Sequence, residues 1–336
     1  MRMQYMKGKV GMEHFQWFGT AYEVGFQRGM ALREKGLFVP NRIQAQLHPQ
    51  RLVYGAKCAA MTQAYDPSLN AEIHGLSDAL GFPYDQLCAF LFGMYAFTAD
   101  AFCTCVALHD QGGTWLGRNS DFLKEMAPYV IHERINDQYW GNTSAFIELE
   151  DGRNDHGLAI GLTYVRPHRI TCGYHGGMMI RHLLKYCRDV DMAVRECRRL
   201  PIGSSFTLIM ADRFHHLAYL ECCCDHVALR RDDRIVYGVN HFYLDTMKEY
   251  RLRADLSDLH SDERLETIRH WVHQYPKQDE QLLRGLLKGA YGFMCQYPAH
   301  CPADTLWSVL YRCDEDDTSL CVGNPQRCAY KRIPVE

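Results

Sequence analysis

The sequence predicts an α+β fold in which helices come first and strands follow. Apolar residues recur at helical spacing in four segments before residue 100, at 24–37, 42–65, 70–80 and 84–97. Helix breakers such as Pro40, Pro67 and Pro83 separate these segments. After residue 100, short strand-like runs dominate and join through Gly, Asp or Asn turns such as that expected at 150–152, which favours antiparallel pairing. Strands in two groups with helices outside them would form a layered domain.

The strands and helices expected in this second part follow from the same patterns. Strands are predicted at 144–149, 157–165, 204–211, 216–221, 226–230 and 234–239. Helices are predicted at 175–199, 261–273 and 278–289, and a closing hairpin is predicted to pair 305–311 with 318–322.

Composition excludes several classes of function. The 336 residues are 47% hydrophobic and 23% charged, as in an ordinary soluble globular protein. A formal net charge of −3 gives no basic surface for nucleic acid, and no run of 18 apolar residues predicts a membrane span. Residues 1–9 contain no apolar run long enough for a signal peptide. We therefore expect a cytoplasmic protein whose fifteen cysteines are free thiols.

The residues with the clearest chemistry lie close together after residue 100. Residues 103–109 read as one strand, 110–113 as a turn and 114–117 as a second strand, so the sequence predicts a β-hairpin. The hairpin would fold Arg118 and Asp121 back beside Cys103. An arginine next to a thiol favours the thiolate, and an aspartate can hold a neighbouring cation.

This group contains a nucleophile but no base. Cleavage of the chain before Cys103 would release an α-amino group, which titrates at about 7.7–8.0 and could accept the thiol proton. Nucleophiles that use their own N-terminal amine in this way are an established solution. The residues therefore suggest a chain that cuts itself between Phe102 and Cys103.

Two short motifs carry a family resemblance. Residues 103–107 read Cys-Thr-x-x-Ala and residues 117–122 read Gly-Arg-Asn-x-Asp-Phe. Both resemble the N-terminal-nucleophile (Ntn) hydrolases of the penicillin acyltransferase type (peptidase C45), which are related to choloylglycine hydrolases and acid ceramidases. Further matches occur in the same order along the chain, at 19–29, 179–184, 208–212 with Glu221, 239–242 and 321–325.

The resemblance implies a fold, a processing step and an activity. The fold would be the four-layer αββα Ntn-hydrolase sandwich. Residues 1–102 would be a helical pro-segment that stays bound after cleavage, and residues 103–336 the catalytic portion, so that both pieces form one catalytic fold. The activity would be that of an amidohydrolase or acyltransferase on linear amides through an acyl-thioester, with a small-molecule amide or acyl donor, no cofactor and a possible homo-oligomer.

The resemblance also assigns roles to individual residues. Cys103 would be the nucleophile, Arg118 would lie in the substrate pocket beside the thiol, and Asp121 would bind the new α-amino group. The side-chain amide N–H of Asn240 would donate to the oxyanion, and such a donor contributes about 2.7–4 kcal/mol in the transition state. Arg264 would bind substrate near the nucleophile.

Other readings of these residues remain open. Cys105 is the rival nucleophile, since strand alternation places it on the same face as Cys103. The Cys103/Cys105 pair and the run Cys222–Cys224 could instead form a metal- or thiol-binding protein, although their spacing is not that of a zinc site and no metal is expected. A non-catalytic descendant of the family is a further alternative. His241 is expected to point away from Asn240 and to take no part in the chemistry.

Overall fold

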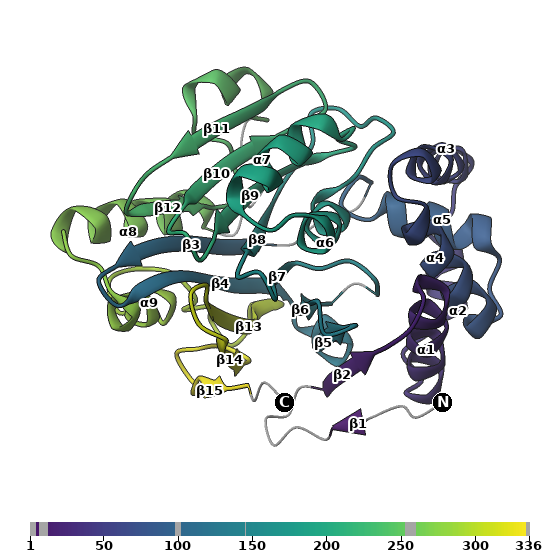
Figure 1. Cartoon of the computed structure of the whole chain (residues 1–336), viewed down its shortest axis with the longest axis horizontal. Helices are drawn as coiled ribbons and strands as arrows, with labels where there is room; N and C mark the ends of the chain where they lie inside the picture. The colour runs from purple at the N-terminus through teal and green to yellow at the C-terminus, as the bar shows by residue number, and fades with distance from the viewer. Residues whose placement is uncertain (1–4, 7–12, 98–101, 145, 253–259, 334–336) are drawn as a thin grey trace.

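Two β-sheets stacked face to face form the centre of the molecule (Figure 1). The structure, a computed structural model, describes residues 5–6, 13–97, 102–144, 146–252 and 260–333. Within these residues, one sheet has nine strands in the order β1 (Tyr5–Met6), β2 (Glu13–Trp17), β5 (Ile131–Ile135), β6 (Tyr139–Thr143), β7 (Asp151–Asn154), β8 (Ala159–Val165), β9 (Ser205–Ala211), β10 (Leu217–Cys222) and β11 (Val227–Arg231). The other has six described strands, β12 (Ile235–Gly238), β3 (Phe102–Asp110), β4 (Gly113–Leu123), β13 (Ala303–Arg312), β14 (Asp317–Val322) and β15 (Lys331–Arg332).

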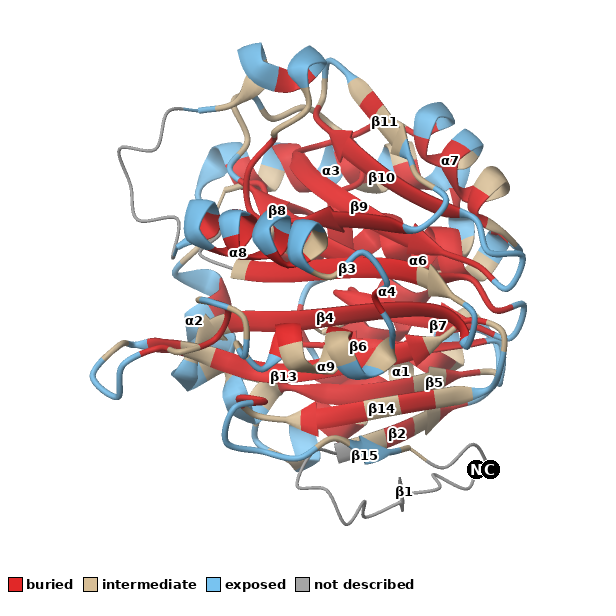
Figure 2. Ribbon diagram, turned by 90° about the vertical axis from the view of Figure 1, so that its left-hand side faces the viewer, coloured by how far each residue is buried: buried red, intermediate tan, exposed pale blue. Residues whose placement is uncertain are grey.

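Helices cover the outer face of each sheet. Helices α6 (Gly176–Tyr186) and α7 (Val190–Arg199) pack on the nine-stranded sheet, where Leu183 and Val194 join Leu208 in one apolar cluster. Helices α8 (Ser261–Gln274) and α9 (Glu280–Leu287) pack on the six-stranded sheet, with Ile268 and Leu283 against it. Buried strands fill the space between the helical layers (Figure 2). The predicted four-layer αββα sandwich is confirmed.

Residues before Phe102 form five described helices beside α6 (Figure 1): α1 (Ala21–Glu34), α2 (Pro40–Gln44), α3 (Pro49–Tyr65), α4 (Pro67–Leu80) and α5 (Tyr84–Gly93). Glycines let α1 and α4 cross in direct backbone contact. A Cβ on Gly25 would lie 1.9 Å from the Glu72 carbonyl oxygen, and one on Gly75 would lie 1.9 Å from the Tyr22 carbonyl oxygen. Gly25, in the stretch 19–29 that carries part of the family resemblance, therefore serves helix packing.

The N-terminal part is not purely helical. Strand β2 pairs in parallel with β5, so this part also contributes to the nine-stranded sheet. The sequence did not predict β2, β5 or β6. Buried polar residues such as His132, Glu133 and Asn142 interrupt the apolar alternation that identifies strands.

One predicted strand is wrong. Ala145 lies outside the described residues, but 146–149 form a turn and an irregular segment instead of a strand. Phe146 has a φ of 61°, a left-handed conformation that a strand cannot contain. The strand of this region is β7, and it begins at Asp151, where the sequence suggested a turn. The predicted helix at 175–199 is likewise two helices, because Asp189 caps a new one at Val190.

Two expectations from composition can be compared with the structure. All fifteen cysteines lie in the described part of the chain, and each is a free thiol. Among the described residues, no helix has the length and apolar character needed to cross a membrane.

Candidate active site

The β3–β4 hairpin presents two chemically different faces. Its register pairs Cys103 with Ser120 and Cys105 with Arg118, and paired residues of an antiparallel ladder share a face. These four side chains point into the space between the sheets. Thr104, Asn119 and Asp121 alternate with them and lie on the opposite face, toward α8 and α9. The predicted hairpin is present. It places Arg118 near Cys103 on the face between the sheets, and Asp121 near Cys103 on the face toward α8 and α9.

Between the sheets, the Arg118 guanidinium contacts the thiol directly. Its Nη2 donates to Cys103 Sγ at 2.8 Å. The same Nη2 is 3.1 Å from Glu150 Oε2, and Nη1 donates to Asp151 Oδ2 at 2.8 Å. Its Nε donates to the Leu162 carbonyl oxygen of β8 at 2.8 Å. With contacts on both sheets, the guanidinium is held in one orientation.

Glu150 and Asp151 are site residues that the sequence reasoning missed. Both are buried, and they follow directly after the irregular segment 146–149. Asp151 also accepts hydrogen bonds from Asn142, Trp307 and Tyr311, at 2.6, 2.8 and 2.7 Å. The sequence does contain a hint of this site, because two adjacent acidic residues follow an apolar run. The same pattern also indicates a turn, which is the simpler interpretation.

Burial governs the ionisation of the thiol. It raises the pKa of Cys103 to about 11; Arg118 and Arg264 oppose this effect, while Glu150 and Asp121 add to it. In the uncut chain the thiol is therefore protonated at neutral pH.

The rival thiol, Cys105, lies deeper between the sheets. Burial raises its pKa well above the usual range. Its sulfur packs on Gly161 of β8, where an added Cβ would lie 2.4 Å from Sγ. The guanidinium hydrogen bond goes to Cys103, so the two cysteines differ in surroundings although they share a face.

On the other face, helix α8 brings Arg264 to the backbone of the nucleophile. Arg264 Nη1 donates to the Cys103 carbonyl oxygen at 2.5 Å and to Thr104 Oγ1 at 2.9 Å. It lies 3.9 Å from Asp121 Oδ2. Asp121 accepts hydrogen bonds from Thr305 Oγ1 at 2.5 Å and Tyr297 Oη at 3.0 Å. Burial raises the pKa of Asp121, and Arg264 opposes that shift most strongly.

Asn240 reaches the same point because of strand register. Strand β12 ends at Gly238 opposite Cys105, so the chain two residues further on lies beside Cys103. Asn240 Oδ1 accepts from the Cys103 backbone N–H at 2.8 Å and from Arg264 Nη2 at 2.8 Å, and its Nδ2 donates to the Tyr164 carbonyl oxygen at 2.9 Å. One N–H of the amide predicted for the oxyanion hole is thus bonded to Tyr164.

His241 makes contacts that are separate from the thiol. Its Nδ1 bonds the Ser261 hydroxyl at 2.8 Å, at the start of α8. Burial lowers the pKa of His241 to about 4, so the ring is neutral near pH 7.

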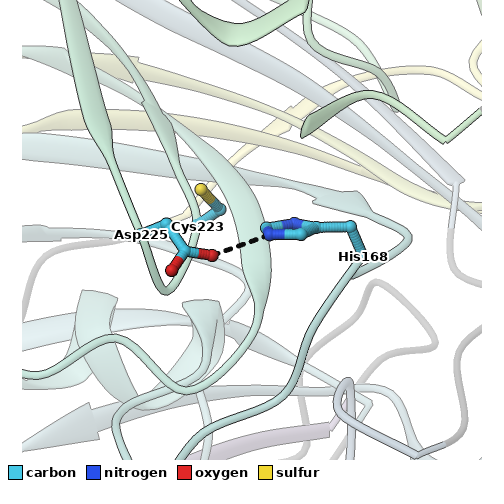
Figure 3. A group of neighbouring side chains, drawn as sticks. All are labelled: His168, Cys223 and Asp225. Carbon is cyan, nitrogen blue, oxygen red and sulfur yellow. Dashed lines mark hydrogen bonds and ion pairs between the residues drawn. The ribbon is translucent and has the colours of Figure 1, made fainter. Parts of the chain in front are cut away.

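Figure 3 shows three side chains that could hold a metal ion, the one such group among the described residues. They are His168, Cys223 and Asp225, with His168 Nε2 2.8 Å from Asp225 Oδ2. The guanidinium of Arg169 pairs with the same carboxylate and already balances its charge. The group contains Cys223, from the Cys222–Cys224 run that the metal-binding alternative used, but neither Cys103 nor Cys105.

Several solved structures resemble this chain, and a bile acid hydrolase shares its fold. A variant of the conjugated bile acid hydrolase from Clostridium perfringens superposes with a TM-score of 0.51 at 11% identity, over 69% of this chain and 92% of its own. An N-acylethanolamine-hydrolyzing acid amidase ortholog from Caenorhabditis elegans gives 0.46 at 15% identity, over 63% and 94%. Penicillin V acylase from Agrobacterium tumefaciens gives 0.44 at 13% identity, over 66% and 82%.

No curated protein sequence matches the chain significantly. A family model does match, that of acyl-coenzyme A:6-aminopenicillanic acid acyl-transferase, and it covers residues 108–327, which is more than half of the chain. The match begins five residues after Cys103, so it does not cover the residue that is expected to be the nucleophile. The chain belongs to the acyl-coenzyme A:6-aminopenicillanic acid acyl-transferase family.

Proposed function

We propose that this protein is a self-processing Ntn amidohydrolase or acyltransferase that acts on linear amide C–N bonds through an acyl-thioester on Cys103. One observation carries the proposal. The Cys103 sulfur accepts a hydrogen bond from Arg118 while its backbone nitrogen donates to Asn240, so a thiol and the precursor of an amine are held together in one buried site.

The first stage is cleavage of the chain. The Cys103 thiol adds to the Phe102 carbonyl carbon, the acyl group moves from nitrogen to sulfur, and water hydrolyses the thioester to release a segment that ends at Phe102. Asn240 holds the Cys103 nitrogen and Arg264 holds its carbonyl oxygen, which supports this step because both ends of the residue are fixed while the bond rearranges.

The second stage is turnover. The freed α-amine takes the thiol proton, and the thiolate attacks the amide carbonyl of a small-molecule substrate. Asp121 is proposed to hold the protonated amine, since Phe102 and Asp121 are paired across β3 and β4. Asn240 is proposed to turn an amide N–H toward the oxyanion once Cys103 is an N-terminus. The substrate C–N bond breaks as its amine leaves with the proton held by the α-amine, and the acyl-thioester then passes to water or to an acceptor amine. No cofactor enters either step.

Residues 1–102 are proposed to remain bound as part of the same catalytic fold. The pairing of β2 with β5 supports this, because it joins backbone on both sides of the cut by hydrogen bonds.

Trapping the acyl-enzyme tests the proposal. The protein is mixed with an activated ester, p-nitrophenyl acetate, and its mass is recorded after quenching in acid. We expect one acetyl adduct on the fragment that begins at Cys103, sensitive to hydroxylamine, as a thioester is. The adduct should be absent from Cys103→Ala and present in Cys105→Ala. An adduct that persists in Cys103→Ala would assign the nucleophile to another residue.

A further inference from the structure

The uncut chain needs a base that the finished enzyme does not. Before cleavage the Cys103 nitrogen belongs to a peptide bond and cannot accept a proton, yet the thiol, whose pKa burial raises to about 11, must lose its proton to attack Phe102. We propose that Glu150 is the proton acceptor for this first step and acts through the hydroxyl of Ser120. The proposal rests on the self-processing function given above.

Two nearby carboxylates are poorly placed for this role. Asp121 lies on the opposite face of the hairpin from the Cys103 side chain, and its oxygens accept from Thr305 and Tyr297. Asp151 accepts four hydrogen bonds, one of them from Arg118 and three from the side chains of Asn142, Trp307 and Tyr311. Arg118 is the donor that links Asp151 to the Cys103 sulfur, and a guanidinium stays protonated and therefore cannot pass on the thiol proton.

Glu150 is linked to the thiol through Arg118, and it also bonds Ser120, the residue paired with Cys103 across the hairpin. The Ser120 hydroxyl donates to Glu150 Oε2 at 2.9 Å. Ser120 lies directly opposite Cys103 in the ladder, on the same face, where paired Cβ atoms are about 4.5–5.5 Å apart. Arg118 Nη2 lies within hydrogen-bond distance of both Cys103 Sγ and Glu150 Oε2. The proposed relay requires the hydroxyl to accept from the thiol while it donates to the carboxylate, which the shared face of the two paired residues allows.

Ser144 fixes the other oxygen of the same carboxylate. Glu150 Oε1 accepts from the Ser144 hydroxyl at 2.6 Å and from its backbone N–H at 3.2 Å. Because Oε1 is held in this way, Oε2 stays directed at Ser120 and Arg118. A group held in the required geometry needs little reorganisation when the proton moves.

The step balances without a co-reactant. The thiol proton passes to Ser120 Oγ as the Ser120 proton passes to Glu150, and the sulfur forms a bond to the Phe102 carbonyl carbon. When the bond between that carbon and the Cys103 nitrogen breaks, the proton returns by the same route to the nitrogen. The products are a thioester and an amine, and Glu150 is again a carboxylate. From then on the amine serves as the base.

The test compares Glu150→Gln with a matched control, Glu148→Gln. Glu148 is buried in the same segment, and neither of its oxygens bonds Arg118 or Ser120. Freshly purified proteins are incubated at pH 7.5, and the uncut fraction is followed by intact mass spectrometry. Since general bases contribute 10²–10⁴-fold, we expect cleavage of Glu150→Gln to slow by about 100-fold or more. Glu148→Gln should cleave as the wild type does, and Glu150→Asp, which keeps a carboxylate, should fall between them.

A second measurement separates a base from a structural residue. Uncut Glu150→Gln is compared with uncut Ser120→Ala, which keeps the Glu150 charge, and iodoacetamide labelling of Cys103 is quantified by peptide mass spectrometry. We expect Cys103 to be labelled faster in Glu150→Gln, because a negative charge that opposes thiolate formation is gone. Slow cleavage together with faster labelling supports the proposal.

Two outcomes would overturn this inference without affecting the proposed function. In the first, Glu150→Gln cleaves as fast as the wild type. In the second, cleavage of Glu150→Gln and labelling of its Cys103 are both slower, which would indicate a damaged site. A wild-type protein that never cuts would instead overturn the proposed function on which the inference rests.

Discussion

At the scale of single residues, Arg118 determines the charge balance of the site. Its guanidinium is fully buried and lies between the Cys103 sulfur and the carboxylates of Glu150 and Asp151. The Trp307 ring lies beneath it, 5.5 Å from its central carbon. Breaking a buried ion pair by removing one partner costs far more than the pair contributes, since it leaves the other partner charged and without compensation.

Replacement of Arg118 should therefore destabilise the protein and weaken the nucleophile. We expect Arg118→Leu to lower the free energy of unfolding in urea by about 3–5 kcal/mol. The pKa of Cys103 should rise, because Arg118 is the group that lowers it most. The control is Arg199→Leu, an exposed arginine paired with Glu196, which should cost about 0–1 kcal/mol. Equal stability of the two variants would contradict this description of the site.

A second residue should make stability depend on pH. Glu221 of β10 is buried, and burial raises its pKa from an ordinary 4.5 to about 7. The folded state therefore holds this proton more tightly than the unfolded state. The resulting stabilisation is present in full below pH 4.5 and is lost as the pH rises through about 7. At about 1.4 kcal/mol per pKa unit, it amounts to about 3 kcal/mol.

Urea unfolding at pH 4.5, 6 and 8 tests this expectation. Wild-type stability, measured relative to Glu221→Gln at each pH, should fall by about 3 kcal/mol across the range, since the glutamine cannot titrate. A difference between the two proteins that stays constant with pH would show that Glu221 has an ordinary pKa.

The sequence predicted the neighbours of the thiol better than their orientation. Cys103, Arg118 and Asp121 lie in one hairpin, and hairpin register follows from local pattern. Glu150 joins them from a different sheet, through an irregular segment whose path no local pattern specifies. For Asn240, the resemblance implied its location, but only the structure shows that the carbonyl and not the amide N–H faces Cys103.

At the scale of secondary-structure elements, a buried ion-pair network joins the N-terminal helices to the sandwich. Arg28 of α1 and Glu72 of α4 meet Glu133 of β5 and Arg181 of α6. Trp17 of β2 donates to Glu133 at 2.8 Å. Each of the four charged residues is buried, so the network connects segments on both sides of the proposed cut where water cannot screen it.

Loss of one member should loosen this junction. We expect Arg181→Ala to lower the free energy of unfolding by about 3–5 kcal/mol, because Glu72 and Glu133 lose a buried partner. In processed protein the two fragments should separate at a lower urea concentration than in wild type, as measured by size-exclusion chromatography. The exposed-arginine control Arg199→Ala should not change the elution. Fragments of Arg181→Ala that stay together as strongly as wild type would show that apolar packing alone holds them.

The errors in predicted elements have a common cause. Strands β5 and β6 bury His132, Glu133 and Asn142, and 146–149 buries Glu148 without forming a strand. Alternation of apolar and polar residues identifies a strand only when the buried side chains are apolar. In this region Glu133 pairs with Arg28 and Arg181, and Asn142 bonds Asp151, the partner of Arg118, so some of the polar residues serve charges from distant parts of the chain.

At the scale of the whole molecule, the two pieces of the proposed enzyme are parts of one fold. The largest apolar cluster contains residues of α1, α4 and α5 together with residues of α6, α7 and β9. Pairing of β2 with β5 extends the nine-stranded sheet across the same boundary. Cleavage after Phe102 would therefore cut the backbone without dividing the core, and both fragments should co-elute under native conditions.

The layered architecture was predictable because the patterns that specify it repeat along the chain: apolar helical spacing before residue 100 and strand alternation after it. The division of the strands between two sheets was not predictable from these patterns, since periodicity does not say which strands share a sheet. That information came from the resemblance to Ntn hydrolases, and the structure and the family match agree with it.

The central claim is that the chain cuts itself between Phe102 and Cys103 and uses Cys103 as its new N-terminus. Intact mass spectrometry of purified wild-type protein, beside Cys103→Ala and Cys105→Ala, tests it most directly. Wild type and Cys105→Ala should each give two polypeptides, one covering residues 1–102 and one covering 103–336, while Cys103→Ala should give a single chain. A wild-type protein that remains one chain, or a Cys103→Ala variant that is processed while Cys105→Ala stays uncut, would contradict it.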